Sequence, residues 1–300
     1  MSQKGLEKPT GTFEHAPYRV LAAHEPSSDP NLVSVITRTR NRHDMLREAI
    51  ASVIAQDHRP LEMIIVNDGG ESVDPVIASF STDVVLRVVQ TPSVGRCVAG
   101  NLGLAQARGT WICWLDDDDL YLPQHVSTLL AHLQSSGKRV AYTDAYRVDQ
   151  VRNSSGEWVE QSRSLPWSED FSRIMMFRQS YIHLVTVMHH RCCFEVLGGF
   201  DPRLEVLEDW DMFFRFSQDH EFEHIKATTA IFRVRDNESN AVTAMRREFV
   251  ETRALLFARY SHIAFPDLLN QLELGRGEIA ALHGRIQRLE DRIAQLESRP

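Results

Sequence analysis

Residues 111–119 have the sequence Trp-Ile-Cys-Trp-Leu-Asp-Asp-Asp-Asp, in which five apolar residues precede four adjacent carboxylates. The apolar part predicts a buried strand. Four like charges repel one another, and an unpaired buried carboxylate is costly, so the acids require a cation or a solvated cleft. Mg²⁺ and Mn²⁺ favour carboxylate oxygens, and Mg²⁺ is often bound together with substrate phosphates. The segment predicts either a metal–diphosphate site at the carboxyl end of a central strand or a solvated acidic turn.

The remainder of the first half alternates apolar strands with amphipathic helices. Asp44 is the expected N-cap of the first helix. Continuous apolar strands that alternate with helices indicate a parallel sheet covered on both faces. We therefore expect an α/β fold with a mixed, mainly parallel, Rossmann-like sheet. The expected strands are 32–37, 61–66, 84–89 and 110–115, and the expected helices are 44–56 and 95–107.

The second half follows a different pattern. Residues 151–180 are polar and predict an irregular insertion or a loop on the acceptor side. A strand over 182–189 would place His183 and His189 on one face, where we interpret them as structural or acceptor-side residues rather than metal ligands. The other expected elements are strands over 222–225 and 230–234 and helices over 209–219 and 241–260.

The C-terminal tail carries a heptad pattern over about residues 272–298. Isoleucine at a and leucine at d favour a parallel two-stranded coiled coil. Arginines at g and glutamates at e would form opposite-charge pairs between the two helices. The tail therefore predicts a parallel homodimer, although pairing with another protein or packing of one amphipathic helix on its own domain are alternatives. The a and d positions are Ile279, Ile286, Ile293, Leu282, Leu289 and Leu296, and the charged positions are Arg285, Arg292, Glu290 and Glu297.

Composition limits the binding partners and the cellular location that we expect for the chain. The net charge of −8 disfavours nucleic acid as a partner, because phosphate binding requires a basic surface. A local basic patch would still suit anionic lipid. We expect no transmembrane segment, since no apolar stretch approaches roughly 18 residues. The four cysteines show no metal-binding spacing, which favours a reducing, cytoplasmic location, with peripheral association at the inner face of a membrane as an extension.

Six segments taken together resemble glycosyltransferase family 2, whose members are inverting enzymes of the GT-A fold. The resemblance covers about residues 32–240. The segments are Val33–Arg42, Glu62–Gly70, Gly95–Gly109, Leu115–Asp119, Gly198–Asp211 and Phe232–Ser239. It implies a nucleotide-sugar-binding half over 31–135 and an acceptor-binding half over 136–240. The polar composition of residues 1–30 predicts a flexible arm, and residues 241–300 predict a helical extension.

The resemblance implies a binding site for a nucleotide-diphospho-sugar, by default a UDP-sugar. Arg40 replaces an aromatic residue of the family pattern and can stack on a base. Asp68 corresponds to an acid that accepts a hydrogen bond from the nucleobase, and an Asx turn is the alternative. Arg96 is a candidate for the diphosphate. The nucleotide loop contributes Thr37, Arg38, Thr39 and Arg42.

The acidic run resembles the metal-binding motif of the family. Asp118 is the implied direct ligand of Mn²⁺ or Mg²⁺. Asp116 is implied at the ribose or in the water shell of the metal, and Asp117 at the ribose. Asp119 is expected to cap the following turn instead.

Asp209 resembles the general base of an inverting transferase, with Glu208 at its side. Paired acids raise one another's pKa, which suits a base acting near neutral pH, but acids are also common at a helix N-terminus for electrostatic reasons alone. Trp210 is either a sugar platform or core, and Asp211 is a second-choice base. Arg235 replaces a histidine of the family and would neutralise the diphosphate.

These expectations describe a metal-dependent inverting glycosyltransferase of surface polysaccharide or glycan synthesis, with a glycan or lipid-linked acceptor. A sugar nucleotidyltransferase is one alternative, but it would require a glycine-rich, lysine-bearing loop that residues 37–42 lack. A coiled-coil scaffold with a degenerate sugar-nucleotide fold is the other, and the intact Asp116, Asp118 and Asp209 disfavour it.

Overall fold

The computed structural model describes residues 20, 22–235, 245 and 247–263, together with the isolated helical positions 277, 284, 285, 287 and 288. The a and d residues of the predicted coiled coil lie outside the described residues, as do residues 1–19 of the predicted arm. No helix in the described part of the chain is long and apolar enough to cross a membrane.

A nine-stranded mixed sheet runs through the molecule in the order β3-β2-β1-β4-β8-β6-β9-β5, with β7 paired to β6. Its first half is parallel and consists of β1 (Val33–Thr39), β2 (Leu61–Asp68), β3 (Val85–Thr91) and β4 (Trp111–Trp114). β1 and β2 are buried along their whole length, which explains their continuous apolar sequences. The predicted α/β sheet is confirmed.

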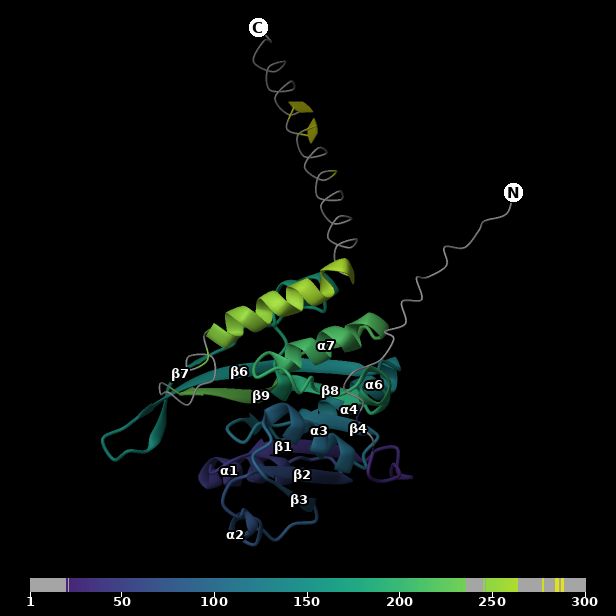
Figure 1. The fold of residues 1–300 in the computed structure, drawn as a ribbon. Coiled ribbons are helices and arrows are strands. Elements are labelled where there is room, and N and C mark those ends of the chain that lie inside the picture. The colour runs from purple at the N-terminus through teal and green to yellow at the C-terminus, as the bar shows by residue number, and fades with distance from the viewer. Residues whose placement is uncertain are drawn as a thin grey trace.

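Antiparallel pairs appear beyond β4. β8 (Val187–His190) lies antiparallel to β4 and to β6 (Val140–Arg152), and β9 (Phe222–Arg235) lies parallel to β6. The short β5 (Leu120–Tyr121) pairs with β9. β6 continues into an antiparallel ribbon with β7 (Trp158–Ser164), which projects from the body in Figure 1.

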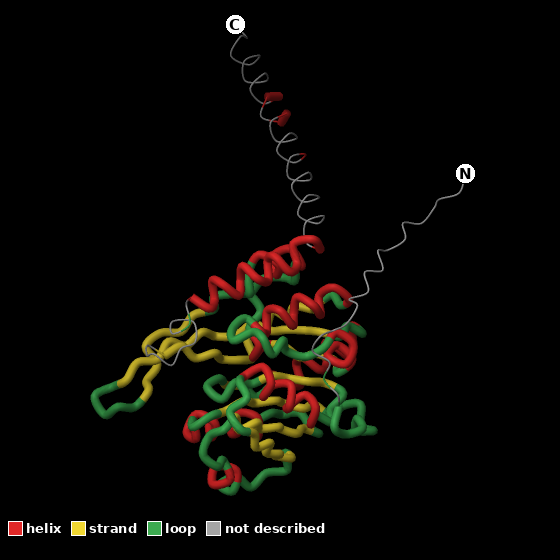
Figure 2. The backbone as a smooth tube through the Cα atoms, viewed as in Figure 1, coloured by secondary structure: helices red, strands yellow, loops and turns green. Residues whose placement is uncertain are grey.

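Helices cover both faces of this sheet (Figure 2). Alternate residues of β2 enter opposite cores: Ile64 packs with the aromatic cluster of α7, whereas Met63 packs with the apolar faces of α1 and α4. The helices are α1 (His43–Ile54), α2 (Asp74–Ile77), α3 (Arg96–Gln106), α4 (His125–Ser136), α5 (Arg173–Arg178), α6 (Cys192–Leu197), α7 (Glu208–Asp219), the 3₁₀ turn η1 (Leu184–Thr186) and a helix over 247–263.

Close packing explains the glycines of α3. A Cβ at Gly103 would lie 2.5 Å from Cγ2 of Ile36, and one at Gly100 would lie 2.6 Å from the ring of Phe200. Helix propensity disfavours glycine, but a larger residue would meet the sheet and the loop that precedes α7. α3 therefore lies close to the strands that end at the cavity described below.

Several predicted elements were wrong in detail. Asp44 does not cap α1, because residue 42 is the N-cap and Asp44 instead pairs with Arg47. The insertion expected at 151–180 contains the β6–β7 ribbon and α5. The strands expected at 222–225 and 230–234 form one strand, since two register shifts against β6 absorb the intervening polar residues.

The described end of the predicted N-terminal arm is bonded to the domain. Residues 22–30 form no helix or strand, yet the Ala23 amide donates to the Ala105 carbonyl at 2.7 Å and the Ser27 amide donates to the Arg108 carbonyl at 2.8 Å. Those bonds fasten this segment to the C-terminal end of α3.

Candidate active site

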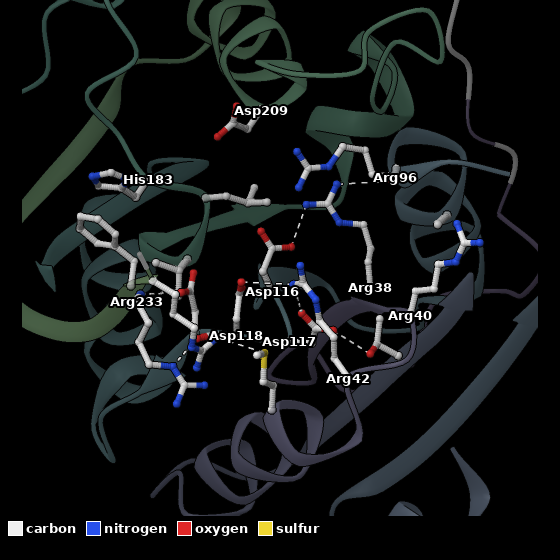
Figure 3. Close-up of a pocket in the computed structure, with 18 of the residues that line it drawn as sticks. Arg38, Arg40, Arg42, Arg96, Asp116, Asp117, Asp118, His183, Asp209 and Arg233 are labelled. Atoms are coloured by element: carbon white, nitrogen blue, oxygen red, sulfur yellow. Dashed lines mark hydrogen bonds and ion pairs between the residues drawn. The ribbon is translucent and has the colours of Figure 1, made fainter. Parts of the chain in front are cut away.

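A cavity of about 560 Å³ opens where β1, β2 and β4 end and where α3 and α7 begin (Figure 3). Strand β9 and the 3₁₀ turn η1 form its other wall. Parallel strands place their carboxyl ends at the same edge, and α/β folds bind ligands there. Ten predicted site residues line it: Arg38, Thr39, Arg42, Asp68, Arg96, Asp116, Asp117, Asp118, Asp209 and Arg235.

Arg38 connects the two sides of this cavity. Its guanidinium donates to Asp116 at 2.8 Å and to Glu208 at 3.0 Å, and only 7% of its side chain is exposed. Burial opposes the charge of Arg38, but the two carboxylates raise its pKa above the usual value. Burial likewise opposes the charge of Asp116, while Arg38 and Arg96 lower its pKa. The pair is therefore charged over the physiological range.

Asp117 is engaged on both oxygens. Thr39 donates to one at 2.7 Å and Arg42 to the other at 3.0 Å, and the residue is 3% exposed. Burial and the neighbouring Asp118 raise its pKa to about 6. In contrast, the side chains of Asp116 and Asp118 are each 31% exposed. The acids available to a ligand are thus the first and third of the run.

Asp119 joins β4 to β9. Its Oδ1 accepts from the backbone amide of Arg233 at 3.0 Å, and the Arg233 guanidinium contacts the carbonyl of Asp118. The prediction that Asp119 caps the following turn is wrong, because its side chain bonds a strand more than 100 residues away. Burial and Asp118 raise its pKa well above the usual value. This contact fixes the end of β9 beside the acidic run.

Asp68 holds the loop before α3. Its two oxygens accept from the backbone amides of Val94 at 2.7 Å and Gly95 at 3.0 Å. Gly95 has φ of +89°, a conformation that favours glycine. The carboxylate therefore fixes the start of α3 and Arg96, and it does not form the alternative Asx turn with its own neighbours. It nevertheless lies on the cavity wall, where a nucleobase contact was predicted.

Glu208 and Asp209 open α7, and Figure 3 shows Asp209 at the upper side of the cavity. Glu208 is 3% exposed and is bonded to Arg38 and approached by Arg96 at 3.4 Å. Asp209 faces the cavity, and its Oδ1 accepts from the Trp210 amide at 2.8 Å. Burial and the charge of Glu208 raise the pKa of Asp209 to about 7. The two adjacent acids therefore differ in their surroundings: Glu208 is paired with arginines, whereas Asp209 faces the cavity.

Four predicted residues lie outside the cavity lining: Glu208, described above, and Thr37, Trp210 and Asp211. Thr37 is fully buried, and its Oγ1 has no hydrogen-bond partner among the described residues. Trp210 is 5% exposed, donates from Nε1 to the Met176 carbonyl and packs edge-on against Phe257. The platform prediction for Trp210 is wrong, because the indole belongs to the core.

Asp211 is fully buried and engaged by cations. Arg259 donates to its Oδ1 at 2.7 Å, Tyr260 donates to the same oxygen at 2.6 Å, and Arg215 donates to Oδ2 at 3.0 Å. It faces the helix over 247–263 instead of the cavity. The assignments of Asp211 as an acceptor residue and as an alternative base are therefore wrong.

Arg235 carries unused hydrogen-bonding capacity at the cavity wall. It is 7% exposed, its Nη1 lies 3.0 Å from the Met45 sulfur, and its guanidinium lies over the Trp158 ring at 5.4 Å. Its Nε has no partner among the described residues. Burial and the charge of Arg233 lower its pKa. Such a cation favours an anionic ligand.

The cavity is also lined by His183, which the sequence predicted as a structural or acceptor-side residue, and by several residues that the sequence did not indicate. His183 stacks on Phe232 with ring centroids 4.0 Å apart, and its Nε2 has no partner in the described part of the chain. Burial lowers its pKa to about 4, so the ring is neutral near pH 7. His183 precedes η1 and does not share a strand face with His189, whose Nε2 accepts from Trp114 in the core. The other lining residues are Arg40, Met45, Ala99, Asp119, Leu184, Val185, Phe232, Arg233 and Val234.

The cavity and its fold define a class of sugar-transferring enzymes. The sequence profile of Glycosyl transferase family 2 matches residues 34–195, more than half of the chain. The chain belongs to glycosyltransferase family 2, and it is a glycosyltransferase. The resemblance predicted from the motifs is thereby confirmed.

Relatives agree with this membership. The uncharacterized glycosyltransferase YwdF of Bacillus subtilis (strain 168) is 26% identical over 73% of this chain and 81% of its own length. The putative colanic acid biosynthesis glycosyl transferase WcaA of Escherichia coli (strain K12) is 30% identical over 61% of this chain and 65% of its own length.

Solved structures share the fold. TarS 1-349 of S. aureus in complex with UDP-GlcNAc superposes with a TM-score of 0.58 at 18% identity, over 69% of this chain and 59% of TarS 1-349. The mannosyltransferase PcManGT of Pyrobaculum calidifontis, in complex with GDP-Man and Mn²⁺, gives 0.57 at 16% identity, over 80% of this chain and 67% of its own. The sheet is therefore of the GT-A type that was expected.

Proposed function

We propose that the chain is an inverting glycosyltransferase that moves a sugar from a nucleotide-diphospho-sugar to an acceptor hydroxyl. The observation that carries the proposal is the position of Asp209, an acid with a raised pKa, across one cavity from Asp116 and Asp118. A general base requires a pKa near the working pH and access to the acceptor proton. Asp209 combines both properties.

The basic side chains of the cavity support a diphosphate as the bound group. Arg38, Arg42 and Arg96 lie beside the acidic run, and Arg235 approaches from β9 with an unpartnered Nε among the described residues. Guanidinium groups bind phosphate oxygens through paired, charge-assisted hydrogen bonds. We assign the nucleotide to the side formed by Thr39, Arg40 and Asp68 and the diphosphate to the arginines. Thr37, which is buried, would act only through the position of β1.

Asp116 and Asp118 fit a divalent cation. Both side chains are partly exposed to the cavity, and both are already paired with guanidinium groups, which indicates that the acids require a positive partner. Their oxygens are hard ligands that suit Mn²⁺ or Mg²⁺. When bound, such an ion would stabilise the negative charge of the leaving diphosphate. Asp117 and Asp119 are occupied by protein donors and would hold the run in place.

In the proposed transfer step one proton moves, one bond forms and one bond breaks. Asp209 would accept the proton of the acceptor hydroxyl while the hydroxyl oxygen of the acceptor bonds the anomeric carbon. The bond from that carbon to the diphosphate breaks on the opposite face, so the configuration inverts and a nucleoside diphosphate leaves. Arg38 and Arg96 neutralise Glu208, which leaves Asp209 as the acid open to the acceptor.

The proposals for the acceptor and for the biosynthetic process are based on similar proteins. WcaA is described as a putative colanic acid biosynthesis glycosyl transferase, and a chondroitin synthase of Pasteurella multocida is 25% identical over 65% of this chain and 20% of its own length. We therefore propose a glycan or lipid-linked acceptor in polysaccharide synthesis. A parallel homodimer through residues 272–298 and a cytoplasmic place at the inner membrane face belong to the same proposal on sequence grounds.

The test is a transfer assay on the full chain with a panel of nucleotide sugars, with Mn²⁺ and with EDTA. Asp209→Asn should lower turnover by about 10²–10⁴-fold with donor affinity retained, because only the proton acceptor is lost. Asp219→Asn, an exposed acid at the other end of α7, is the matched control. Unchanged turnover in Asp209→Asn would remove the base assignment. A retained anomeric configuration in the product would remove the inverting mechanism.

A further inference from the structure

A second group of ligand-type side chains lies at the join of α6 and α7, apart from the cavity lining. Cys192 and Cys193 begin α6, and His220 directly follows the end of α7. The two sulfurs and a ring nitrogen of His220 all lie within 4.8 Å of one another. Both cysteines are free thiols. The sequence spacing conceals this group, because the histidine lies 27 positions beyond the second cysteine.

The spacing of these atoms fits one bound ion. Zn–S bonds of about 2.3 Å and Zn–N bonds of about 2.0–2.1 Å in a tetrahedron place ligand atoms roughly 3.5–3.8 Å apart. In the structure each of the three separations is at most 4.8 Å, so the ligand atoms would have to approach one another by no more than about 1.3 Å to hold one ion.

The chemistry of the group favours a thiophilic ion. Two thiolates and an imidazole suit Zn²⁺, whereas Mg²⁺ and Mn²⁺ prefer oxygen. Cys193 is fully buried, while Cys192 and His220 are partly exposed, so the group is open to solvent on one side. Three protein ligands leave a fourth position for water. Binding would release the thiol protons, including the one that Cys193 directs toward the Arg139 carbonyl at 3.8 Å.

The surrounding backbone supports the arrangement. The Cys192 amide donates to Nδ1 of His190 at 3.2 Å, and the His190 amide donates to the Arg139 carbonyl at 2.8 Å. These bonds fix the first turn of α6 against β8 and β6. The other cysteines differ: the Cys97 thiol donates to the Leu204 carbonyl, and Cys113 is enclosed in β4.

We propose that Cys192, Cys193 and His220 form a metal site for a thiophilic divalent ion such as Zn²⁺, separate from the acid-lined cavity. The ion would join the start of α6 to the end of α7. Because α7 begins with Glu208 and Asp209, the site would hold the helix that carries them. Its role would be structural, in the sense that it adds binding energy to the folded state.

The test uses Co²⁺ as a spectroscopic substitute for Zn²⁺ on the full chain, freed of metal by chelation and kept reduced. One equivalent of Co²⁺ should produce sulfur-to-cobalt charge-transfer absorption, which the cavity carboxylates are unable to generate. Zn²⁺ should displace it and raise the melting temperature. Cys192→Ser and His220→Ala, at partly exposed positions, should each weaken binding at least about tenfold.

Two controls separate this site from the cavity. Cys97→Ser and His132→Ala should keep the cobalt signal, because neither residue belongs to the group. The double variant Asp116→Asn with Asp118→Asn should also keep it, even where sugar transfer is lost. Absence of the sulfur–cobalt band in the reduced wild type would overturn the proposal. So would an unchanged affinity for Co²⁺ in Cys192→Ser and in His220→Ala.

Discussion

The Arg38 guanidinium lies 3.0 Å from the Glu208 carboxylate, although the two residues are 170 positions apart in the chain. One residue ends a strand in the first half and the other opens a helix in the second. Arg38 also bonds Asp116, so one charge network joins the end of the first strand, the acidic run and the start of α7. It fixes Glu208 and so determines which of the two adjacent acids faces the cavity.

Arg38→Met should destabilise the protein, because it leaves two carboxylates without their cation. Removing one partner of a buried ion pair typically costs about 3–5 kcal/mol. We expect a value near the lower limit, since Asp116 is partly exposed. Urea unfolding measures the loss. Adding Glu208→Gln should recover part of it, and Arg47→Met, at an exposed pair on α1, should change the free energy of unfolding by less than about 1 kcal/mol. Equal effects of the two arginine variants would contradict the network.

The pH dependence should report Asp209. Its pKa is raised to about 7 by burial and by Glu208, so the base is protonated and inactive below that value. kcat/KM should therefore rise with pH through about 7 and then level off. The profile of Asp209→Asn should lack this step.

Stability should change in the opposite direction over the same interval. With a raised pKa, the folded state holds the Asp209 proton to higher pH than the unfolded state does. The contribution of the protonated form is present at low pH and is lost as pH rises through about 7. Comparing the free energy of unfolding of wild type and Asp209→Asn at pH 5 and pH 8 measures it. The assignment would be contradicted if Asp209→Asn exceeded the wild type in free energy of unfolding by more at pH 5 than at pH 8.

Asp118→Asn should weaken metal-dependent nucleotide binding. We expect Mn²⁺ to increase the thermal stabilisation produced by a nucleoside diphosphate, since a ligand of the folded state raises its apparent stability. The variant should lose most of this increase, and EDTA should reproduce the loss in the wild type. Asp44→Asn, an exposed acid near the start of α1, serves as control. Full retention in Asp118→Asn would exclude the residue as a ligand.

Gly103→Ala should destabilise α3 despite a gain in helix propensity. Alanine is favoured by about 1 kcal/mol in a helix, but its Cβ would lie 2.5 Å from Ile36 in the centre of the sheet. Overpacking typically costs about 1–3 kcal/mol, so the net change should be a loss of about 1 kcal/mol. Thermal unfolding checks it. Ser135→Ala, on the exposed side of α4, is the control and should be neutral or stabilising. An increase in thermal stability in Gly103→Ala as well as in Ser135→Ala would contradict the packing argument.

The predictable part of this molecule is local. Apolar runs fixed the first four strands, and the acids at 116–119 mark where the cavity lies, because strand and motif are continuous in sequence. Contacts between segments that are distant in the sequence could not be predicted from local patterns. Asp119 bonds β9, His183 leaves its expected strand, and Trp210 points into the core one position from Asp209. A helix turns by roughly 100° per residue, so neighbours on α7 meet different surroundings.

The Trp158 ring on the projecting ribbon lies against Arg235, at the cavity wall. The other tryptophans are at 111, 114 and 210 in the core and at 167 on the surface. An anion that draws the guanidinium inward would change the electric field on one indole. If the diphosphate binds Arg235 as proposed, the enzyme would contain its own optical reporter, and the difference in emission between wild type and Trp158→Phe would follow donor occupancy without an added dye.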